Sequence, residues 1–162
     1  MRKSHSSKNG QVYYIEFMIT LVVMIIALVI FIRTFVNVNE SAGYDDLSIQ
    51  ADSISTQLMS EGLPANWTKS NVEKIGITNS QSRIQESKLL NFANMSYQTT
   101  RQKLNTNYNY YVFLENSTGS RILIAGKQGV GLMGNQSKTV VKVTRFPIYK
   151  SDIVRMIVYV WE

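Results

Sequence analysis

The sequence of 162 residues contains no cysteine, and that absence excludes several classes of function. Without cysteine the chain has no disulfide framework, no thiolate ligand for a metal and no thiol nucleophile. Its only histidine, His5, lies in a polar stretch near the N-terminus, which argues against catalytic triads and against zinc held by imidazoles. The acidic residues are scattered, and no two of them form a motif for general acid and base catalysis. The sequence therefore predicts a protein that is not an enzyme and that uses neither a metal nor a cofactor.

Basic residues are only slightly in excess of acidic ones outside the first ten residues. The formal net charge is +6, from 17 basic and 11 acidic residues. Three of the basic residues, Arg2, Lys3 and Lys8, lie in the first ten positions, which leaves 14 basic residues against 11 acidic ones elsewhere. No stripe of lysine and arginine interleaved with aromatic residues is present, so nucleic acid is not an expected partner.

A long apolar run is the dominant feature of the N-terminal third. From Phe17 to Val36, 17 of 20 residues are apolar, and the stretch Phe17–Ile32 carries no charge. A helix over Val12–Val36 would be about 37 Å long, enough to cross a hydrocarbon core of about 30 Å. A lone segment in lipid must satisfy its backbone internally, which favours helix over strand. The sequence predicts a membrane-spanning helix over residues 11–38, preceded by a basic leader over residues 1–10.

The charges that flank this run predict its orientation in the bilayer. The basic leader lies on one side, and Glu40, Asp45 and Asp46 lie on the other. The positive-inside rule then places the N-terminus in the cytoplasm and the chain from about residue 40 outside the cell. All five Asn-X-Ser/Thr sequons fall on the outer side, and they are candidate N-glycosylation sites. Their asparagines are Asn39, Asn66, Asn94, Asn116 and Asn135.

The junction between leader and apolar run differs from an ordinary secretory signal. A secretory signal has a short apolar core followed by a small residue at the cleavage site, whereas here Gly10 precedes a long apolar stretch. One acid, Glu16, lies at the start of that stretch, where a carboxylate is costly. Two interpretations stay open. Glu16 lies solvated at headgroup depth, or it pairs with a cation of a neighbouring chain, for which a freshly exposed α-amine is the natural candidate.

The segment KNGQVYYIEF at residues 8–17, followed by the apolar helix, resembles the class III signal peptide of archaeal type IV pilin-like proteins. The resemblance implies that a prepilin peptidase cuts after Gly10 and makes Gln11 the new N-terminus. It also implies that the retained helix packs against other pilin-like subunits in a filament core. Glu16 would be the sixth mature residue, where the family usually carries its acid fifth; a cut after Gln11 would restore that spacing, and both bonds stay open. Short segments at residues 63–67, 75–77 and 158–161 resemble an uncharacterised group of archaeal pilin-like proteins and imply no activity.

A second helix is predicted after the apolar run, over residues 39–62. Leu47, Ala51, Ile54 and Leu58 recur at helical spacing and form one apolar stripe. The helix is expected to stop at Gly62. This segment is the predicted stem, and residues 41–43 are a joint or a kink between it and the membrane helix.

Residues 63–162 are expected to form a small extracellular α+β domain. Helices are predicted at Glu86–Ala93 and Tyr97–Asn105, the latter with Ser96 as its N-cap. Alternating and aromatic-rich segments predict two hairpins, and hence an antiparallel sheet of four or five strands covered on one face by the helices and the stem. The predicted strands are Tyr108–Glu115, Arg121–Ala125, Thr139–Ile148 and Ile153–Trp161.

Two patterns in this domain are candidate binding sites. Gly129, Gly131 and Gly134 fit G-x-G-x-x-G, but a strand instead of a helix is predicted to follow, so a hairpin loop is expected and not a dinucleotide site. A set of aromatic residues could stack on a ligand, although at alternating strand positions such residues usually anchor the core. The set consists of Trp67, Tyr108, Tyr110, Tyr111, Tyr159 and Trp161.

The sequence leaves two hypotheses for function. The first is a pilin-like subunit of the cell membrane that assembles into a surface filament or a secretion-type pseudopilus. Its expected partners are the lipid bilayer, a prepilin peptidase and other pilin-like subunits. The alternative is an uncleaved single-pass membrane protein that displays an extracellular binding module.

Overall fold

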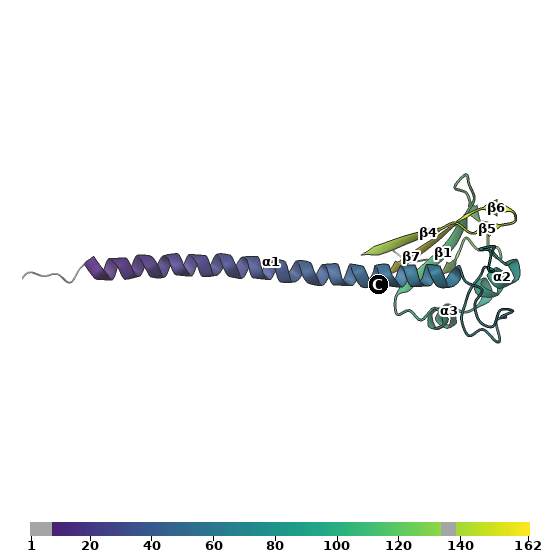
Figure 1. Ribbon diagram of the computed structural model, residues 1–162, viewed down its shortest axis with the longest axis horizontal. Coiled ribbons are helices and arrows are strands. Elements are labelled where there is room, and N and C mark those ends of the chain that lie inside the picture. The colour runs from purple at the N-terminus through teal and green to yellow at the C-terminus, as the bar shows by residue number, and fades with distance from the viewer. Residues whose placement is uncertain (1–7, 134–138) are drawn as a thin grey trace, which may run out of the picture. The chain divides into compact units, whose positions relative to one another are not determined.

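The computed structural model describes residues 8–133 and 139–162, and of residues 8–12 and 35–43 it describes the backbone alone. The chain divides into two compact units, Met1–Gly43 and Tyr44–Glu162. Helix α1 (Lys8–Leu58) contributes residues to both units (Figure 1). We call Tyr44–Glu162 the globular domain.

The first unit contains the apolar part of α1. The segment Tyr13–Thr34 has a mean hydropathy of 3.0 and is long and apolar enough to cross a membrane. All of its side chains are exposed. An apolar helix at the predicted place is therefore confirmed, although it does not end at residue 38 but continues without a break, through residues 41–43, as far as Leu58.

The globular domain is built on one antiparallel sheet of five strands, within the predicted range. Its order is β2-β1-β7-β4, with β3 also paired to β1. Strand β1 pairs with β7 along its whole length, from Asn109 opposite Trp161 to Glu115 opposite Arg155. These strands are β1 (Asn109–Glu115), β2 (Arg121–Ile122), β3 (Val130–Gly131), β4 (Val140–Arg145) and β7 (Arg155–Trp161).

The predicted hairpin between β4 and β7 carries a small second sheet at its tip. Strands β5 (Ile148–Tyr149) and β6 (Asp152–Ile153) pair with each other around Lys150 and Ser151. Pro147 lies just before β5, outside every named strand, which is where a residue without a backbone N–H is tolerated.

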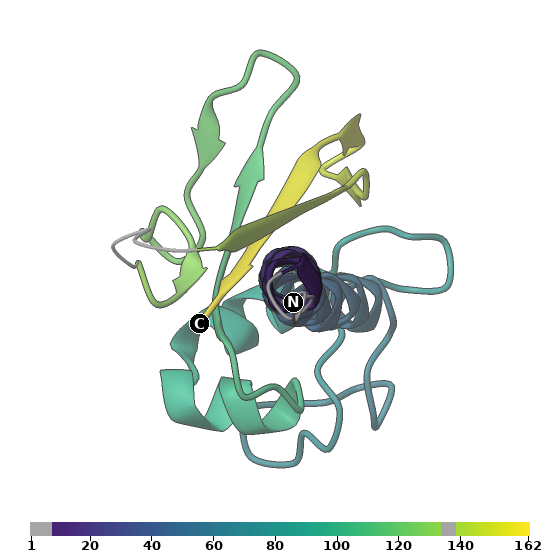
Figure 2. The same ribbon diagram turned by 90° about the vertical axis from the view of Figure 1, so that its left-hand side faces the viewer.

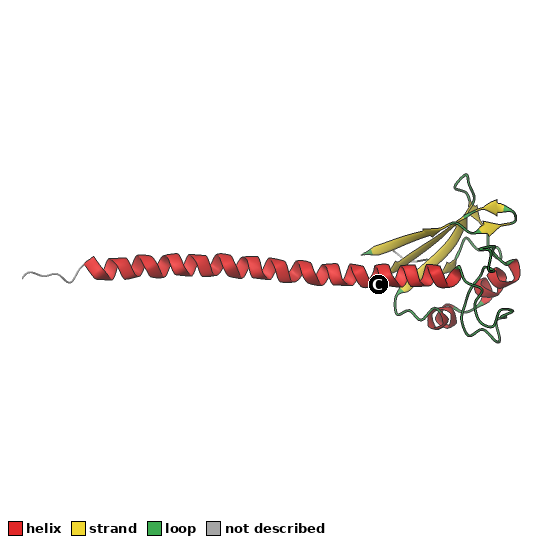
Figure 3. Ribbon diagram, in the orientation of Figure 1, coloured by secondary structure: helices red, strands yellow, loops and turns green. Residues whose placement is uncertain are grey.

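Helices cover one face of the sheet. Helices α2 (Glu86–Asn94) and α3 (Tyr97–Lys103) lie on that face, and Figure 2 shows them in teal opposite the green and yellow strands. The side chain of Ser96 accepts a hydrogen bond from the Thr99 N–H, so the predicted N-cap of α3 is confirmed. The segment between α1 and α2 is loop, drawn in green in Figure 3.

The core lies between this sheet face and the helices. The predicted stripe of α1, Leu47, Ala51, Ile54 and Leu58, is at most 1% exposed. It packs in one cluster with alternate residues of β1 and β7, as expected for strands whose side chains point to opposite faces. The sheet residues of this cluster include Tyr110, Val112, Leu114, Met156, Val158 and Val160. Because the stripe belongs to the core, the compact domain begins at Tyr44 and not at residue 63.

Helix α1 ends at Leu58, four residues before the predicted stop at Gly62. The carbonyl of Leu58 accepts a hydrogen bond from the Ile77 N–H at 2.9 Å, and that of Ser60 accepts one from the Thr78 N–H at 3.2 Å. The carbonyl of the last helical residue and that of Ser60, just beyond the helix, are therefore satisfied by a later loop, which allows the helix to end at Leu58.

The glycine-rich segment is partly a strand, contrary to the expected loop. Val130 and Gly131 pair with Val112 and Tyr111 of β1. A Cβ atom at Gly131 would lie 2.3 Å from the Tyr110 carbonyl oxygen, so glycine permits this close approach. Gly134 lies outside the described residues.

Candidate assembly helix and polar groove

The apolar segment of α1 exposes apolar side chains all around the helix. A helix on the surface of a soluble domain normally buries one apolar stripe, whereas no part of Tyr13–Thr34 is buried. The hydroxyls of its two threonines bond to the backbone of the same helix. Thr20 donates to the Glu16 carbonyl at 2.8 Å, and Thr34 donates to the Ile30 carbonyl at 2.9 Å. Internal hydrogen bonding of this kind is what an apolar surrounding requires.

Glu16 lies near the start of this segment, with an exposed side chain. Its carboxylate makes no ion pair with any residue whose side chain the structure describes. Those side chains, in residues 13–34, 44–133 and 139–162, therefore do not supply the counter-ion that one interpretation of Glu16 requires. Gly10 and Gln11 lie in the first turns of α1.

The sequons differ in their surroundings. Asn66 and Asn94 are exposed, at a loop and at the last residue of α2. The Asn116 side chain is half-buried, and its Oδ1 accepts hydrogen bonds from Thr118 and from the Ser120 N–H in the turn after β1. The side chain of Asn39 and all of Asn135 lie outside the described part of the chain.

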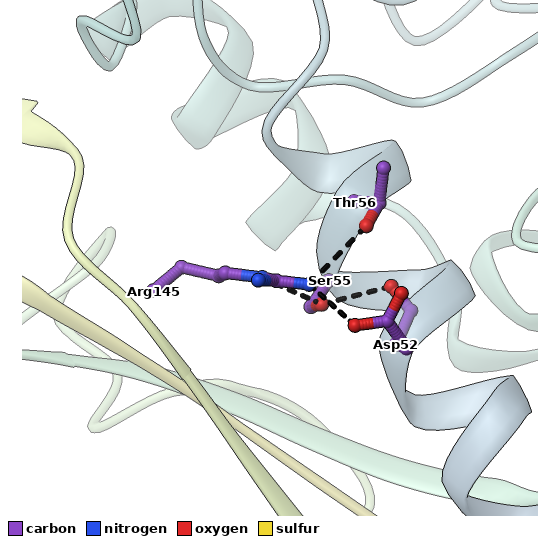
Figure 4. Close-up of polar contacts among 4 residues, drawn as sticks. All are labelled: Asp52, Ser55, Thr56 and Arg145. Carbon is purple, nitrogen blue, oxygen red and sulfur yellow. Dashed lines mark hydrogen bonds and ion pairs between the residues drawn. The ribbon is translucent and has the colours of Figure 1, made fainter.

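Polar contacts fasten the sheet to the second half of α1. Figure 4 shows Arg145, at the end of β4, reaching Asp52, Ser55 and Thr56 of the helix. Its Nη2 lies 2.5 Å from the Asp52 carboxylate, and its Nε donates to the Ser55 hydroxyl at 3.1 Å. The Arg145 side chain is 35% exposed and that of Asp52 65%, so the pair contributes about 1 kcal/mol at most and mainly fixes the position of β4.

A second contact joins the helix to the residue before β1. The Tyr108 hydroxyl donates to the Asp46 carboxylate at 2.5 Å. This hydrogen bond raises the pKa of Tyr108, since loss of the phenolic proton would remove the bond and place two negative charges together.

The aromatic residues of the candidate stacking platform are mostly buried. Trp67 and Tyr110 belong to the core under the helices, and the Trp67 indole N–H donates to the Gly76 carbonyl at 2.7 Å. Tyr111 and Trp161 belong to a smaller cluster on the opposite face of the sheet. Burial raises the pKa of Tyr110, whose hydroxyl is hydrogen-bonded to that of Thr100. The expectation that these side chains anchor the core is confirmed for all four.

A polar groove of about 410 Å³ lies between α2 and the loop that follows α1. Of the side chains that line it, Asn66, Gln85 and Asn91 make no hydrogen bond to any described residue. Lys88 is only 8% exposed, and its ammonium donates to the carbonyls of Glu61 at 2.9 Å and Thr78 at 3.4 Å. The principal lining residues are Glu61, Asn66, Trp67, Gln85, Lys88 and Asn91.

Sequence reasoning did not identify this groove. Lys88 stands four residues before the buried Phe92 on α2, so it occupies a position of the buried stripe. A lysine at such a position is the one signal that could have pointed to the groove, because lysine is rarely buried without a partner.

The described residues contain no group of three or more His, Asp or Glu side chains that could hold a metal ion. Comparison with models of protein families, with curated proteins and with solved structures finds no match to this chain. The features of this chain that bear on function are therefore the apolar helix, the residues around its start and the groove.

Proposed function

We propose that the chain is a membrane-anchored, pilin-like subunit that assembles through its N-terminal helix into a surface filament or a secretion-type pseudopilus. The observation that carries this proposal is the segment Tyr13–Thr34, which exposes apolar side chains all around the helix and has a single acid near its start. The basic leader with Gly10 and Gln11 supports processing by a prepilin peptidase. The same leader supports a cytoplasmic N-terminus and a globular domain outside the cell.

Assembly of such helices depends on specific contacts. Lipid tails are as apolar as the side chains of the segment, so transfer from bilayer to filament gains little from the hydrophobic effect. Close packing and a paired charge must then decide which helices associate and in what register. Glu16 is the acid available for this pairing, and the α-amine of a processed neighbour is its proposed partner.

Replacement of Glu16 by Gln tests the pairing. Gln retains the size and hydrogen-bonding groups of the side chain and removes the charge, so membrane insertion and folding of the domain should persist. A buried charge left unpaired costs about 3–5 kcal/mol, which would lower incorporation into filaments by about a hundredfold or more. The measurement compares the sheared filament fraction with the membrane pool for wild type and Glu16→Gln.

Glu73→Gln is the matched control, because Glu73 is an exposed acid of the globular domain. This variant should assemble like wild type. Equal filament yields from Glu16→Gln and wild type would contradict the pairing and leave Glu16 as a solvated acid at headgroup depth. Wild-type protein confined to the membrane pool would instead favour the alternative, an uncleaved anchor that displays the domain, for which the polar groove is the supporting observation.

A further inference from the structure

The groove between α2 and the loop after α1 has more hydrogen-bonding groups than the fold uses. The amide side chains of Asn66, Gln85 and Asn91 face it and make no hydrogen bond to any described residue. Each amide offers two N–H donors and an acceptor oxygen. The fold thus leaves three bifunctional groups on one concave surface.

Lys88 adds a buried charge to this surface. Its ammonium has three N–H donors, of which two reach backbone carbonyls. No ion pair joins it to an acid in the described part of the chain, although a buried ammonium is normally paired. Lys88 lines the groove. The third N–H of its nearly buried ammonium is therefore left to donate to an acceptor in the groove.

The start of α2 and the Glu61 side chain complete the set. Gln85, the N-cap of α2, makes no side-chain capping bond. The N–H groups of the first turn therefore have no capping partner. Glu61 uses one carboxylate oxygen to accept from the Ser80 N–H at 2.9 Å, and its other oxygen remains an acceptor. A single groove is thus lined by a positively charged donor, a negatively charged acceptor and neutral amides that do both.

We propose that this groove binds a saccharide. A sugar hydroxyl both donates and accepts, which matches amide side chains flanked by an ammonium and a carboxylate. An inorganic anion such as sulfate only accepts hydrogen bonds, so it would leave the amide oxygens and the Glu61 carboxylate without donors. An apolar ligand would leave the amides without any partner. Trp67 forms part of the wall at 2% exposure, so hydrogen bonds, and not stacking, provide the recognition.

The saccharide has two sources with the same chemistry. It is either a separate glycan or a sugar linked to Asn66, which stands in an Asn-Trp-Thr sequon and itself lines the groove. The linked source requires the globular domain to lie outside the cell, as proposed above. Binding of a separate sugar does not depend on that orientation or on assembly.

The test uses the full chain, produced in a host that does not glycosylate proteins and held in a detergent without a sugar headgroup. Trp161→Phe leaves Trp67, in the groove wall, as the only tryptophan, since the chain has two. Its fluorescence is followed while glucose, mannose, galactose, N-acetylglucosamine and glucuronate are added in turn. At least one sugar should give a saturable change.

Two variants show whether the response comes from the groove. Gln85→Ala combined with Asn91→Ala should weaken binding roughly tenfold, because each lost hydrogen bond reduces affinity by a factor of a few. Gln81→Ala, an exposed amide that does not line the groove, should leave it unchanged. No saturable response to any of the five sugars, or a response that the double variant leaves intact, would overturn the proposal.

The mass of protein isolated from its native cells, together with its response to added sugar, distinguishes the two sources of the saccharide. A sugar mass that Asn66→Gln removes, together with loss of the response to added sugar, identifies the linked glycan as the occupant. An unmodified chain that responds to added sugar identifies a separate glycan. Both outcomes support a saccharide groove, and the filament yield of Glu16→Gln, measured separately, bears on assembly alone.

Discussion

At the scale of single residues, the globular domain depends on a few positions where backbone or polar groups meet at close range. Gly131 approaches the β1 backbone, and the buried hydroxyls of Tyr110 and Thr100 meet inside the core. Such positions tolerate little change, because an added atom or a lost partner cannot be offset by solvent.

Gly131 should be far more sensitive to alanine than Gly126. Both have positive φ, +118° and +77°, but a Cβ at Gly131 would collide with the Tyr110 carbonyl, whereas none of the described atoms lies within 4 Å of a Cβ at Gly126. Gly126→Ala should cost about 1 kcal/mol of unfolding free energy from its backbone conformation alone. Gly131→Ala should cost clearly more. Equal losses in chemical denaturation would show that β3 does not pair closely with β1.

Tyr110 should make the domain less stable in strongly alkaline solution. Its pKa is raised in the folded state, so above a pH of about 10 the unfolded phenol loses its proton while the folded one keeps it. The unfolded state then binds fewer protons, and the free energy of unfolding falls by up to about 1.4 kcal/mol per pH unit until the folded pKa is reached. Below pH 10 the phenol is protonated in both states, so the stability that Tyr110 contributes is fully present.

The measurement is chemical denaturation between pH 8 and 11, compared with Tyr110→Phe, which lacks the phenol. The variant should be less stable at pH 8 but should lose less stability on going to pH 11. A parallel pH dependence in the two proteins would show that Tyr110 is not protected in the core.

At the scale of elements, the last part of α1, from Leu47 to Leu58, contributes to the core of the domain. Ile54 is fully buried, whereas Ile49, on the same helix, is 65% exposed. Ile54→Ala should cost about 2–5 kcal/mol of unfolding free energy through lost burial and a cavity. Ile49→Ala should change stability by less than about 0.5 kcal/mol. Similar losses at the two positions would contradict the packing of this helix face on the sheet.

Elements with a strong periodic pattern could be predicted from the sequence. The spacing of Leu47, Ala51, Ile54 and Leu58 predicts a buried helical stripe, and the apolar alternation of β1 and β7 predicts paired strands. Strand β3 could not be predicted, because two residues in a glycine-rich segment carry no period. Its pairing depends on the space that Gly131 leaves at β1, which is a tertiary property.

The groove escaped prediction for a similar reason. Its lining comes from the loop after α1 and from the first turns of α2, which are separate in sequence. Polar residues in loops are normally solvated, and their spacing does not reveal that the amides of Asn66, Gln85 and Asn91 share one cavity. The end of α1 at Leu58 could not be predicted either, since the N–H groups that bond to the carbonyls of Leu58 and Ser60 belong to Ile77 and Thr78.

At the scale of the whole molecule, the two units differ in where their apolar side chains lie. The domain buries its apolar side chains around one sheet, whereas the segment Tyr13–Thr34 exposes all of its own. A helix of this kind needs lipid or other helices around it, because water would be in contact with an apolar surface on every side. The proposed assembly into a filament core supplies such surroundings and gives the acid near the start of the helix a partner.

The most direct test of this account is the N-terminal sequence of the protein extracted from the membranes of its native cells. Processing by a prepilin peptidase predicts a mature chain that begins at Gln11, or at Val12 if the cut follows Gln11, with residues 1–10 absent. Replacement of Gly10 by a bulky residue should then leave a slower-migrating precursor. A chain that retains Met1 and the whole basic leader, with the same mobility in wild type and variant, would contradict the account and identify the protein as an uncleaved membrane anchor.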